Sequence, residues 1–425
     1  MEGSHRQRRP EGTELTLTLE QMAHGGEALG RHEGKVIFVG YSMPGESVRV
    51  RLTEDHASWA RAQLVEVLAS SPDRVIPPCP YFGPERCGGC QWQHIAYERQ
   101  LQLKQEVVID QLRRLGRVAE PPVKSTLAVG EPWGYRNHMQ FSVTRDGRLG
   151  LRRSNSREVV AIDECLLLHP SLQELYASFE LEWDALRRVI LRCGVNTGDR
   201  MVILEADSDE IPEIAIDMPV SVVLHRARKG PFPLAGLPFL RERVGEKVFR
   251  VSSQSFFQVN TAGAEVLLRL VREYLSPKGH ETLLDLYCGV GLFGLSLAEE
   301  VGLVIGIDAS ESAMEDAAYN AEDFGLDNVA LHEGPVEEVL PVLWEPAELA
   351  VLDPPRSGAG REVLAQLPRL HVRRVVYVSC DVATMARDAR FLQELGYRLR
   401  EVQPVDMFPQ TYHIETVSLW EWAPG

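Results

Sequence analysis

Short runs in which hydrophobic and polar residues alternate occupy the first 70 positions of the chain. They lie at residues 15–19, 35–39, 47–52 and 60–67, with glycines between them. Alternation at this close spacing is typical of strands that have one buried face, and several in succession predict a small closed β-barrel. We place this domain at residues 10–70.

The pattern changes to a helical period after the barrel. Between positions 97 and 115 the apolar residues Leu101, Val107, Val108, Leu112 and Leu115 recur at helical spacing, which predicts an amphipathic helix. The chain then becomes strand-rich again, with a strand at 139–143 and a hairpin turn at 146–147. We assign residues 71–250 to a small β-rich central domain, and we expect the helix near 97–116 to pack on the C-terminal domain.

Strands and helices alternate from residue 251 to the end. Apolar strands are expected at 282–287, 304–307, 349–352 and 375–378, with helical segments between them. This alternation predicts an open, mostly parallel, Rossmann-like α/β sheet over residues 251–425. The fold class is therefore multidomain: barrel, central domain and α/β domain.

Composition limits the class of protein. The chain has 425 residues of which 44% are hydrophobic, so intrinsic disorder is excluded. No apolar run reaches the roughly 18 residues of a membrane span, and the N-terminus is polar. We expect a soluble, cytoplasmic protein without membrane contact. In such a protein, seven cysteines are more typical of metal ligands, a nucleophile or core residues than of disulfides.

The net charge of −16 first suggests that nucleic acid is not a partner. However, residues 1–250 carry 33 basic and 34 acidic side chains, so nearly all of the excess is C-terminal. Residues 281–350 hold 16 acids and no Lys or Arg, whereas residues 104–157 hold 11 basic residues and 5 acids. The distribution is compatible with a polyanion bound on one face, although the acidic stretch is also typical of an ordinary solvated surface.

Three cysteines lie on a glycine-rich loop. Cys79 precedes Cys87-Gly88-Gly89-Cys90, and thiolates at this spacing can surround one metal centre. A fourth ligand is then needed, and Cys165 and Cys193 are the candidates. Spacing alone leaves tetrahedral zinc and an iron–sulfur cluster equally open.

A nucleotide-like ligand is indicated at the first strand of the α/β domain. The strand ends in a turn containing Gly289, Gly291 and Gly294, and the next strand ends in Asp308, a residue suited to ribose hydroxyls. These glycines fit a dinucleotide or S-adenosylmethionine. Asp285 inside the strand favours a methyltransferase.

Further candidates follow the later strands. Asp353-Pro354-Pro355-Arg356 forms a rigid loop after one strand, and Ser379-Cys380-Asp381 puts a thiol at the end of another, on the same edge of the sheet. If the segment 408–416 is a strand, His413 and Glu415 share one face. Each motif alone is also compatible with a structural role.

Together these segments resemble the uracil-C5 RNA methyltransferases that carry an N-terminal OB-like TRAM barrel and a four-cysteine iron–sulfur cluster. The stretch Ser255-Phe256-Phe257-Gln258-Val259-Asn260 adds to the likeness. The resemblance implies that the ligands of a [4Fe-4S] cluster are Cys79, Cys87, Cys90 and Cys165. It further implies that the contacts of S-adenosylmethionine are Gln258, Tyr287, Asp308 and Asp353.

The resemblance also implies a mechanism. A thiolate of Cys380 adds to uracil C6, because C5 alone is a poor nucleophile, and Glu415 removes the C5 proton after methyl transfer. His413 is the local alternative base. The barrel and residues 104–157 would hold RNA, with ribosomal RNA of the large subunit favoured by analogy, and we expect a monomer.

Four other functions remain open. Methylation of tRNA uridine or of cytosine C5 would also use a thiol, whereas methylation of an exocyclic amine would not need Cys380. A non-enzymatic alternative is an RNA-binding protein whose cluster is purely structural.

Overall fold

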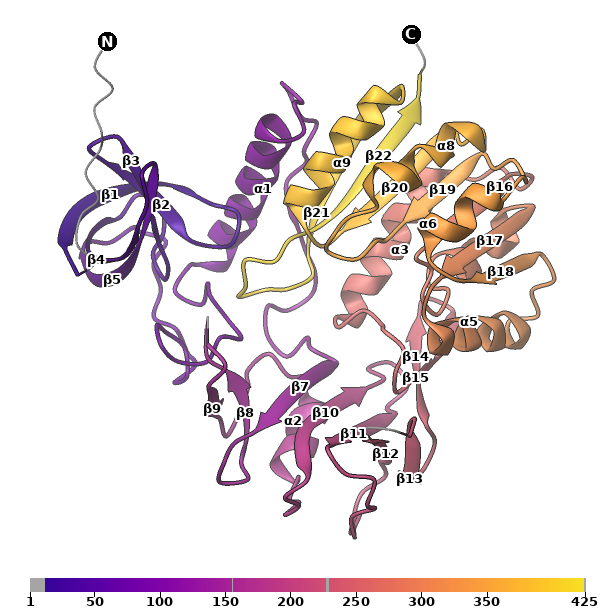
Figure 1. Ribbon diagram of the computed structural model, residues 1–425, viewed down its shortest axis with the longest axis horizontal. Coiled ribbons are helices and arrows are strands. Elements are labelled where there is room, and N and C mark those ends of the chain that lie inside the picture. The colour runs from indigo at the N-terminus through magenta and orange to yellow at the C-terminus, as the bar shows by residue number, and fades with distance from the viewer. Residues whose placement is uncertain (1–11, 155, 227–228, 424–425) are drawn as a thin grey trace.

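A computed structural model describes residues 12–154, 156–226 and 229–423. Figure 1 shows three parts: the barrel, a lower sheet, and a larger α/β domain in orange and yellow. Among the helices that the structure describes, none combines the length and apolar composition needed to cross a bilayer.

The predicted N-terminal barrel is confirmed. Its strands close in the order β1-β2-β3-β5-β4. The alternation places Leu15, Leu17 and Leu19 inside, because successive side chains of a strand point to opposite faces. The strands are β1 (Glu14–Met22), β2 (Ala28–His32), β3 (Lys35–Val39), β4 (Ser47–Asp55) and β5 (Trp59–Ala69). The strand β2 was not predicted, since its sequence carries a glycine and no β-branched residue.

The helix α1 (Tyr97–Arg114) connects the barrel to the rest of the molecule. Its apolar face, with Leu103, Val107 and Val108, is buried against α9 (Val382–Glu394) and β21 (Tyr397–Asp406). In Figure 1 it lies between the barrel and the α/β domain. The periodicity therefore predicted the helix and part of its buried face, Val107, Val108 and Leu112, whereas Leu115 is exposed and Leu101 only half-buried.

The central domain is a mainly antiparallel sheet with one helix on it. The strand order is β13-β12-β11-β10-β7-β8-β9, and the Gly147 amide closes the predicted hairpin turn on the Thr144 carbonyl (3.1 Å). Its elements are β7 (His138–Val143), β8 (Leu149–Arg152), β9 (Val159–Ala161), α2 (Pro170–Ala177), β10 (Leu186–Cys193), β11 (Arg200–Ala206), β12 (Ser221–Arg226) and β13 (Phe232–Ala235). A separate ribbon, β14 (Phe239–Val244) and β15 (Lys247–Ser252), packs on helices of the α/β domain.

The C-terminal sheet has the order β18-β17-β16-β19-β20-β22-β21-β6. Five parallel strands are followed by the antiparallel β22 and by β21, as predicted for a mostly parallel sheet. The strands are β16 (Thr282–Leu286), β17 (Leu303–Asp308), β18 (Val329–Glu333), β19 (Leu349–Leu352), β20 (Arg374–Ser379) and β22 (Glu415–Trp422). The two-residue β6 (Leu127–Ala128) comes from the segment that we assigned to the central domain, and it pairs with β21.

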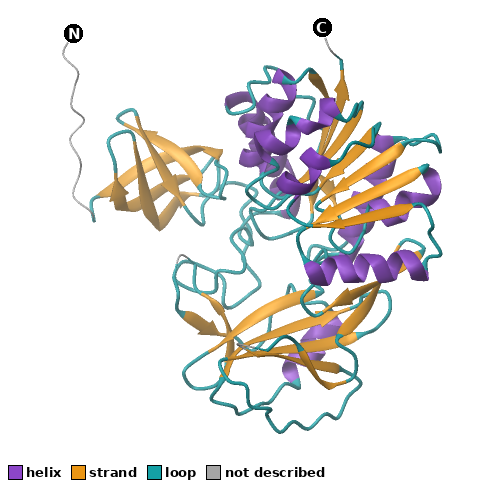
Figure 2. Cartoon of the chain, turned by 45° about the vertical axis from the view of Figure 1, so that its right-hand side comes forward, coloured by secondary structure: helices purple, strands orange, loops and turns teal. Residues whose placement is uncertain are grey.

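Helices cover both faces of this sheet (Figure 2). Leu283 belongs to the hydrophobic core on one face, and its neighbours Leu284 and Leu286 to the core on the other. Such strands read as continuous apolar runs because both of their faces are buried. The helices are α3 (Thr261–Leu275), α4 (Gly294–Leu297), α5 (Glu311–Asp323), α6 (Val336–Val339), α7 (Gly360–Leu364), α8 (Gln366–Arg369) and α9.

Candidate active site

The predicted site residues gather at the carboxyl edge of the C-terminal sheet. Tyr287 follows β16, Asp308 ends β17, Asp353 follows β19 and Cys380 follows β20. Neighbouring parallel strands end at the same edge, where open α/β sheets bind their ligands. The topology therefore brings together residues that lie almost 100 positions apart.

The glycine turn is held by two carboxylates. Asp308 accepts hydrogen bonds from the Gly289 amide (2.9 Å) and the Ser310 amide (2.8 Å). Asp285 accepts one from the Gly294 amide (2.7 Å), and burial raises its pKa to about 7. Gly291 has φ +91°, a conformation that glycine adopts without strain. The turn is thus fixed for close approach of a ligand to the backbone.

Tyr287 has a strained backbone at this edge. Its φ is +63°, which is uncommon for a residue with a side chain, and its ring is half-buried. Such conformations persist where the surrounding structure imposes them and often mark ligand sites. The conformation turns the chain from β16 into the glycine loop.

Gln258 reaches the same edge from the segment before α3. Its amide Nε2 donates to Asp353 Oδ2 (3.3 Å). The neighbouring Asn260 caps α3 by accepting from the Gly263 amide (3.2 Å) and also donates to the Met407 carbonyl (3.2 Å). Burial, followed by the charges of other acids, raises the pKa of Asp353 to about 7.

Cys380 and Glu415 lie at neighbouring ends of two adjacent strands. β20 and β22 are antiparallel, and Ser379 is paired with Thr416, so the residue after one strand meets the residue that opens the other. Burial raises the pKa of the Cys380 thiol to about 11, and the nearby Glu415 carboxyl contributes. Glu415 is itself buried, and both this burial and Asp353 raise its pKa well above the usual range. The thiol of Cys380 and the carboxyl of Glu415 therefore lie near each other in a largely buried environment.

His413 does not share a strand with Glu415, so that part of the interpretation was wrong. β22 begins only at Glu415, and His413 lies in the preceding loop with its ring against Tyr412 (4.4 Å between ring centroids). Burial and nearby cations lower its pKa to about 4. The loop direction is set by Gln410, which has φ +68° and accepts from the Trp92 amide (3.0 Å).

The four predicted cysteine ligands line one small cavity, between the loop before α1 and the central domain. They are Cys79, Cys87, Cys90 and Cys165. Cys193, the other candidate, does not line it and is buried in the sheet of the central domain. Within the described residues, no three His, Cys, Asp or Glu side chains are arranged to hold a single metal ion. The remaining wall is largely apolar, including Met139, Leu151 and Leu167.

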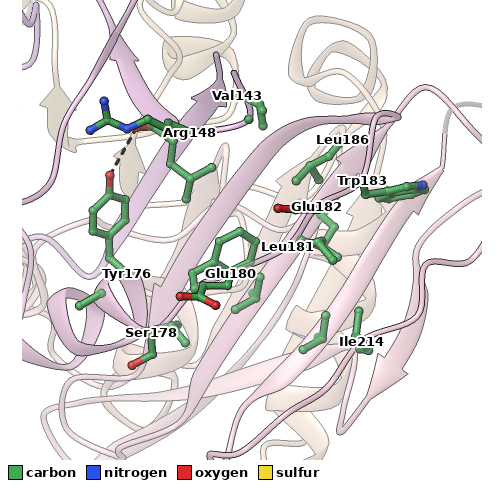
Figure 3. A pocket seen from close by; sticks show the side chains of 18 of the residues that line it. Val143, Arg148, Tyr176, Ser178, Glu180, Leu181, Glu182, Trp183, Leu186 and Ile214 are labelled. Atoms are coloured by element: carbon green, nitrogen blue, oxygen red, sulfur yellow. Dashed lines mark hydrogen bonds between the residues drawn. The ribbon is translucent and has the colours of Figure 1, made fainter. Parts of the chain in front are cut away.

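A larger cavity of about 1500 Å³ lies beside the sheet of the central domain (Figure 3). Tyr176 and Trp183 stand at opposite ends of the view, and Glu180 and Glu182 lie between them. None of the predicted site residues lines this cavity.

The N-terminal barrel also reaches the carboxyl edge of the catalytic sheet, a contact that was not predicted from the sequence. His24, in the loop between β1 and β2, has Nε2 3.9 Å from the Asp381 carboxylate. Asp381 directly follows Cys380. A His-Gly-Gly turn carries no periodic pattern of apolar residues that would predict which part of the protein it packs against. The contact was therefore missed in the sequence analysis.

The comparisons with known proteins agree with this architecture. Residues 239–421 match the family model "tRNA (Uracil-5-)-methyltransferase", and residues 8–65 match the TRAM domain. The chain is 28% identical to the Pyrococcus abyssi tRNA (uracil-54, C5)-methyltransferase, solved in complex with S-adenosyl-L-homocysteine. That alignment has a TM-score of 0.75 and covers 96% of this chain and 100% of the other.

Close relatives extend the match to almost the full length. A Streptomyces avermitilis protein described as an uncharacterized RNA methyltransferase is 39% identical over 97% of this chain and 99% of its own length. A similarly described protein of Streptomyces coelicolor is 40% identical over 97% of this chain and 93% of its own. The chain therefore belongs to the S-adenosylmethionine-dependent RNA (uracil-5-)-methyltransferase family.

Proposed function

We propose that the protein methylates C5 of a uridine in RNA through a covalent bond between Cys380 and uracil C6. The observation that carries the proposal is the juxtaposition of Cys380 and Glu415 across β20 and β22, next to Asp353. Uracil C5 methylation needs a nucleophile for C6 and a base for the C5 proton, and this pair supplies both.

The reaction balances with these two residues. The Cys380 thiolate adds to C6, and the electron pair of the C5–C6 double bond moves into an enolate. When bound, S-adenosylmethionine would supply an electrophilic methyl group to C5 and would leave as S-adenosylhomocysteine. Glu415 then takes the C5 proton, the double bond re-forms, and Cys380 leaves as thiolate. Burial and Asp353 raise the pKa of Glu415, and a carboxylate of higher pKa is a stronger base when it is ionised.

We assign the cofactor to the glycine turn and the residues beside it. Asp308 suits the ribose hydroxyls, and Tyr287 forms one wall of the site. Gln258 and Asp353, which are hydrogen-bonded to each other, lie between this turn and Cys380 in the sheet order. The target base must be unstacked from its neighbours to reach the thiol.

We keep ribosomal RNA of the large subunit as the first substrate to test. That choice rests on the resemblance to relatives that carry a TRAM barrel and a cluster. The Pyrococcus abyssi relative is named for uracil-54 of tRNA, so tRNA is the second substrate in the assay.

We also propose a [4Fe-4S] cluster held by Cys79, Cys87, Cys90 and Cys165. Four thiols around one apolar cavity match the ligand set of such a cluster. Among the described side chains, no group of three or more His, Cys, Asp or Glu is arranged around a single metal ion, so the proposal rests on the shared cavity and on the resemblance. The cluster would tie the loop before α1 to the central domain.

The mechanism predicts a trapped intermediate. RNA that contains 5-fluorouridine should form an adduct with the protein that survives denaturation, because fluorine cannot leave C5 as a proton does. Cys380→Ala should abolish the adduct and reduce methylation on the order of 10³-fold or more, while S-adenosylmethionine binding is retained. Gel shift after denaturation, tritiated-methyl transfer and calorimetry measure the three quantities.

Two further variants sharpen the test. Glu415→Gln should let the methylated adduct accumulate on ordinary uridine RNA, since proton removal is blocked. Cys193→Ala removes a buried thiol outside the site and should behave like the wild type. Methylation of another base, or an adduct that persists in Cys380→Ala, contradicts the mechanism.

A further inference from the structure

The barrel is docked onto the active-site loops. A Cβ atom added to Gly26, in the β1–β2 loop, would lie 2.5 Å from the Cβ of Tyr412, and the Gly26 carbonyl accepts from Trp92 Nε1 (3.1 Å). Tyr412 adjoins His413 in the loop that leads to Glu415. The close backbone approach fixes the β1–β2 loop against the catalytic domain.

This contact brings His24 beside the residue that follows the nucleophile. His24 Nε2 lies 3.9 Å from Asp381 Oδ2. The other carboxylate oxygen, Asp381 Oδ1, caps α9 by accepting from the Thr384 amide (2.9 Å), so it is held in place. The His24 side chain is 35% exposed and remains accessible to a ligand.

Two arginines from the other domains face the same loop. Arg356 is exposed in the loop after β19, and Arg136 lies just before β7. Neither guanidinium has an ion pair within the described part of the chain, and Arg136 Nε is buried there without a hydrogen-bond partner. Both side chains, together with His24 and the buried Lys104, act with burial to lower the pKa of His413.

The charged groups near the site fall into two sets. The acids Asp353 and Glu415 act on each other and on Cys380, whereas the positive charges that act on His413 include Arg356 and Arg136. Two unpaired guanidiniums beside a site for a flipped base leave donors for an anion. The anion that a target nucleotide brings with it is its own phosphodiester.

We propose that His24, Arg136 and Arg356, which we term the cationic rim, bind the phosphates next to the target uridine. The rim takes one residue from each domain, so RNA binding would hold the three domains together at the active site. These are positioning residues, since they act on the strand and not on the reacting atoms. The proposal rests on the proposed function for the identity of the target base.

The salt dependence of RNA binding tests the rim. Each phosphate contact to a single strand contributes about 0.7 to the slope of log Kd against log salt. Arg356→Gln and Arg136→Gln should each lower the slope by about this amount for a labelled oligouridylate. They should also raise the KM for RNA roughly 5- to 10-fold with kcat changed less than about threefold. His24→Gln should raise KM in the same direction.

Arg269→Gln is the matched control. Arg269 is an exposed arginine on α3 that pairs with Glu273 (3.7 Å), and its replacement should leave the slope unchanged. S-adenosylmethionine affinity and the melting temperature report whether each variant is folded. If Arg136→Gln fails to fold, Arg356→Gln and His24→Gln still decide the matter.

The outcomes separate the rim from the proposed function. Slopes that fall for the rim variants but not for Arg269→Gln support the rim, even if the methylated base is not uridine. Slopes that stay unchanged, or fall equally in the control, overturn the rim even if Cys380-dependent uridine methylation is intact.

Discussion

Three carboxyl groups near one edge of the catalytic sheet lack a cationic partner among the described residues: Asp285 and Glu415, which are buried, and Asp353, which is half-buried. Their pKa values are raised, chiefly by burial. A raised pKa means that the folded protein holds protons that the unfolded chain has already released. The free energy of unfolding contributed by these groups therefore falls as pH rises.

Asp285 provides a direct test of this loss of stability at higher pH. Its pKa is about 7 in the fold against the ordinary 3.8 of an aspartate in the unfolded chain, so the loss of stability develops between about pH 4 and pH 7. Asp285→Asn keeps an oxygen for the Gly294 amide but removes the charge. We expect the variant to gain on the order of 2–4 kcal/mol relative to the wild type at about pH 8, and little at about pH 4. Urea unfolding at both pH values measures it.

The exposed Asp327 provides the comparison. Asp327→Asn should shift the unfolding curve little at either pH, because a solvated carboxylate has a similar environment in both states. An Asp285→Asn variant that is equally stabilised at low and high pH would show that the buried charge is not the cause.

At the scale of elements, α1 holds the loop that leads to Glu415. The amide of Gln100 donates to Gln410 Oε1 (3.0 Å), and its oxygen accepts from the Gln410 backbone amide (3.0 Å). One turn further, Lys104 forms a fully buried ion pair with Asp406 (2.5 Å) and donates to the Phe408 carbonyl (3.1 Å). A helix from the segment that we assigned to the central domain thus stabilises the catalytic domain.

Breaking this ion pair should be costly, whereas replacing both partners should not. Lys104→Met leaves the Asp406 carboxylate buried and unpaired, and we expect a loss of about 3–5 kcal/mol together with weaker methylation. The double variant Lys104→Met with Asp406→Leu should recover most of the stability. Thermal unfolding of the two single variants and the double variant measures the coupling. Purely additive losses would contradict the assigned pair.

The pattern of the sequence predicted most elements but few of their long-range contacts. Alternation and apolar runs predicted the barrel and the parallel strands, and the ends of those strands brought Asp308, Asp353 and Cys380 to one edge. No such signal exists for the two-residue β6, which is a strand only because β21 offers a partner. The docking of His24 near Asp381 likewise depends on the tertiary fold.

At the scale of the whole molecule, the net charge of −16 is a poor indicator of whether the protein binds RNA. Residues 281–350 carry the acidic excess on one half of the catalytic domain. The cationic rim lies where the three domains meet. Salt screens surface charges over roughly 8–10 Å, so RNA bound at the rim interacts with the charges close to it more than with the net charge of the chain.

The proposed cluster lies at the same junction. Cys165 belongs to the central domain, and Cys90 is followed by Gln91 and Trp92, whose amides donate to the Gln410 carbonyl (3.1 and 3.0 Å). Wild-type protein purified without oxygen should contain iron and sulfide, about four of each. Cys165→Ser should lose both and expose the loop before α1 to proteases, while S-adenosylmethionine affinity is retained. Cys193→Ser should keep the metal. Stoichiometric zinc, or iron retained in Cys165→Ser, would overturn the assignment.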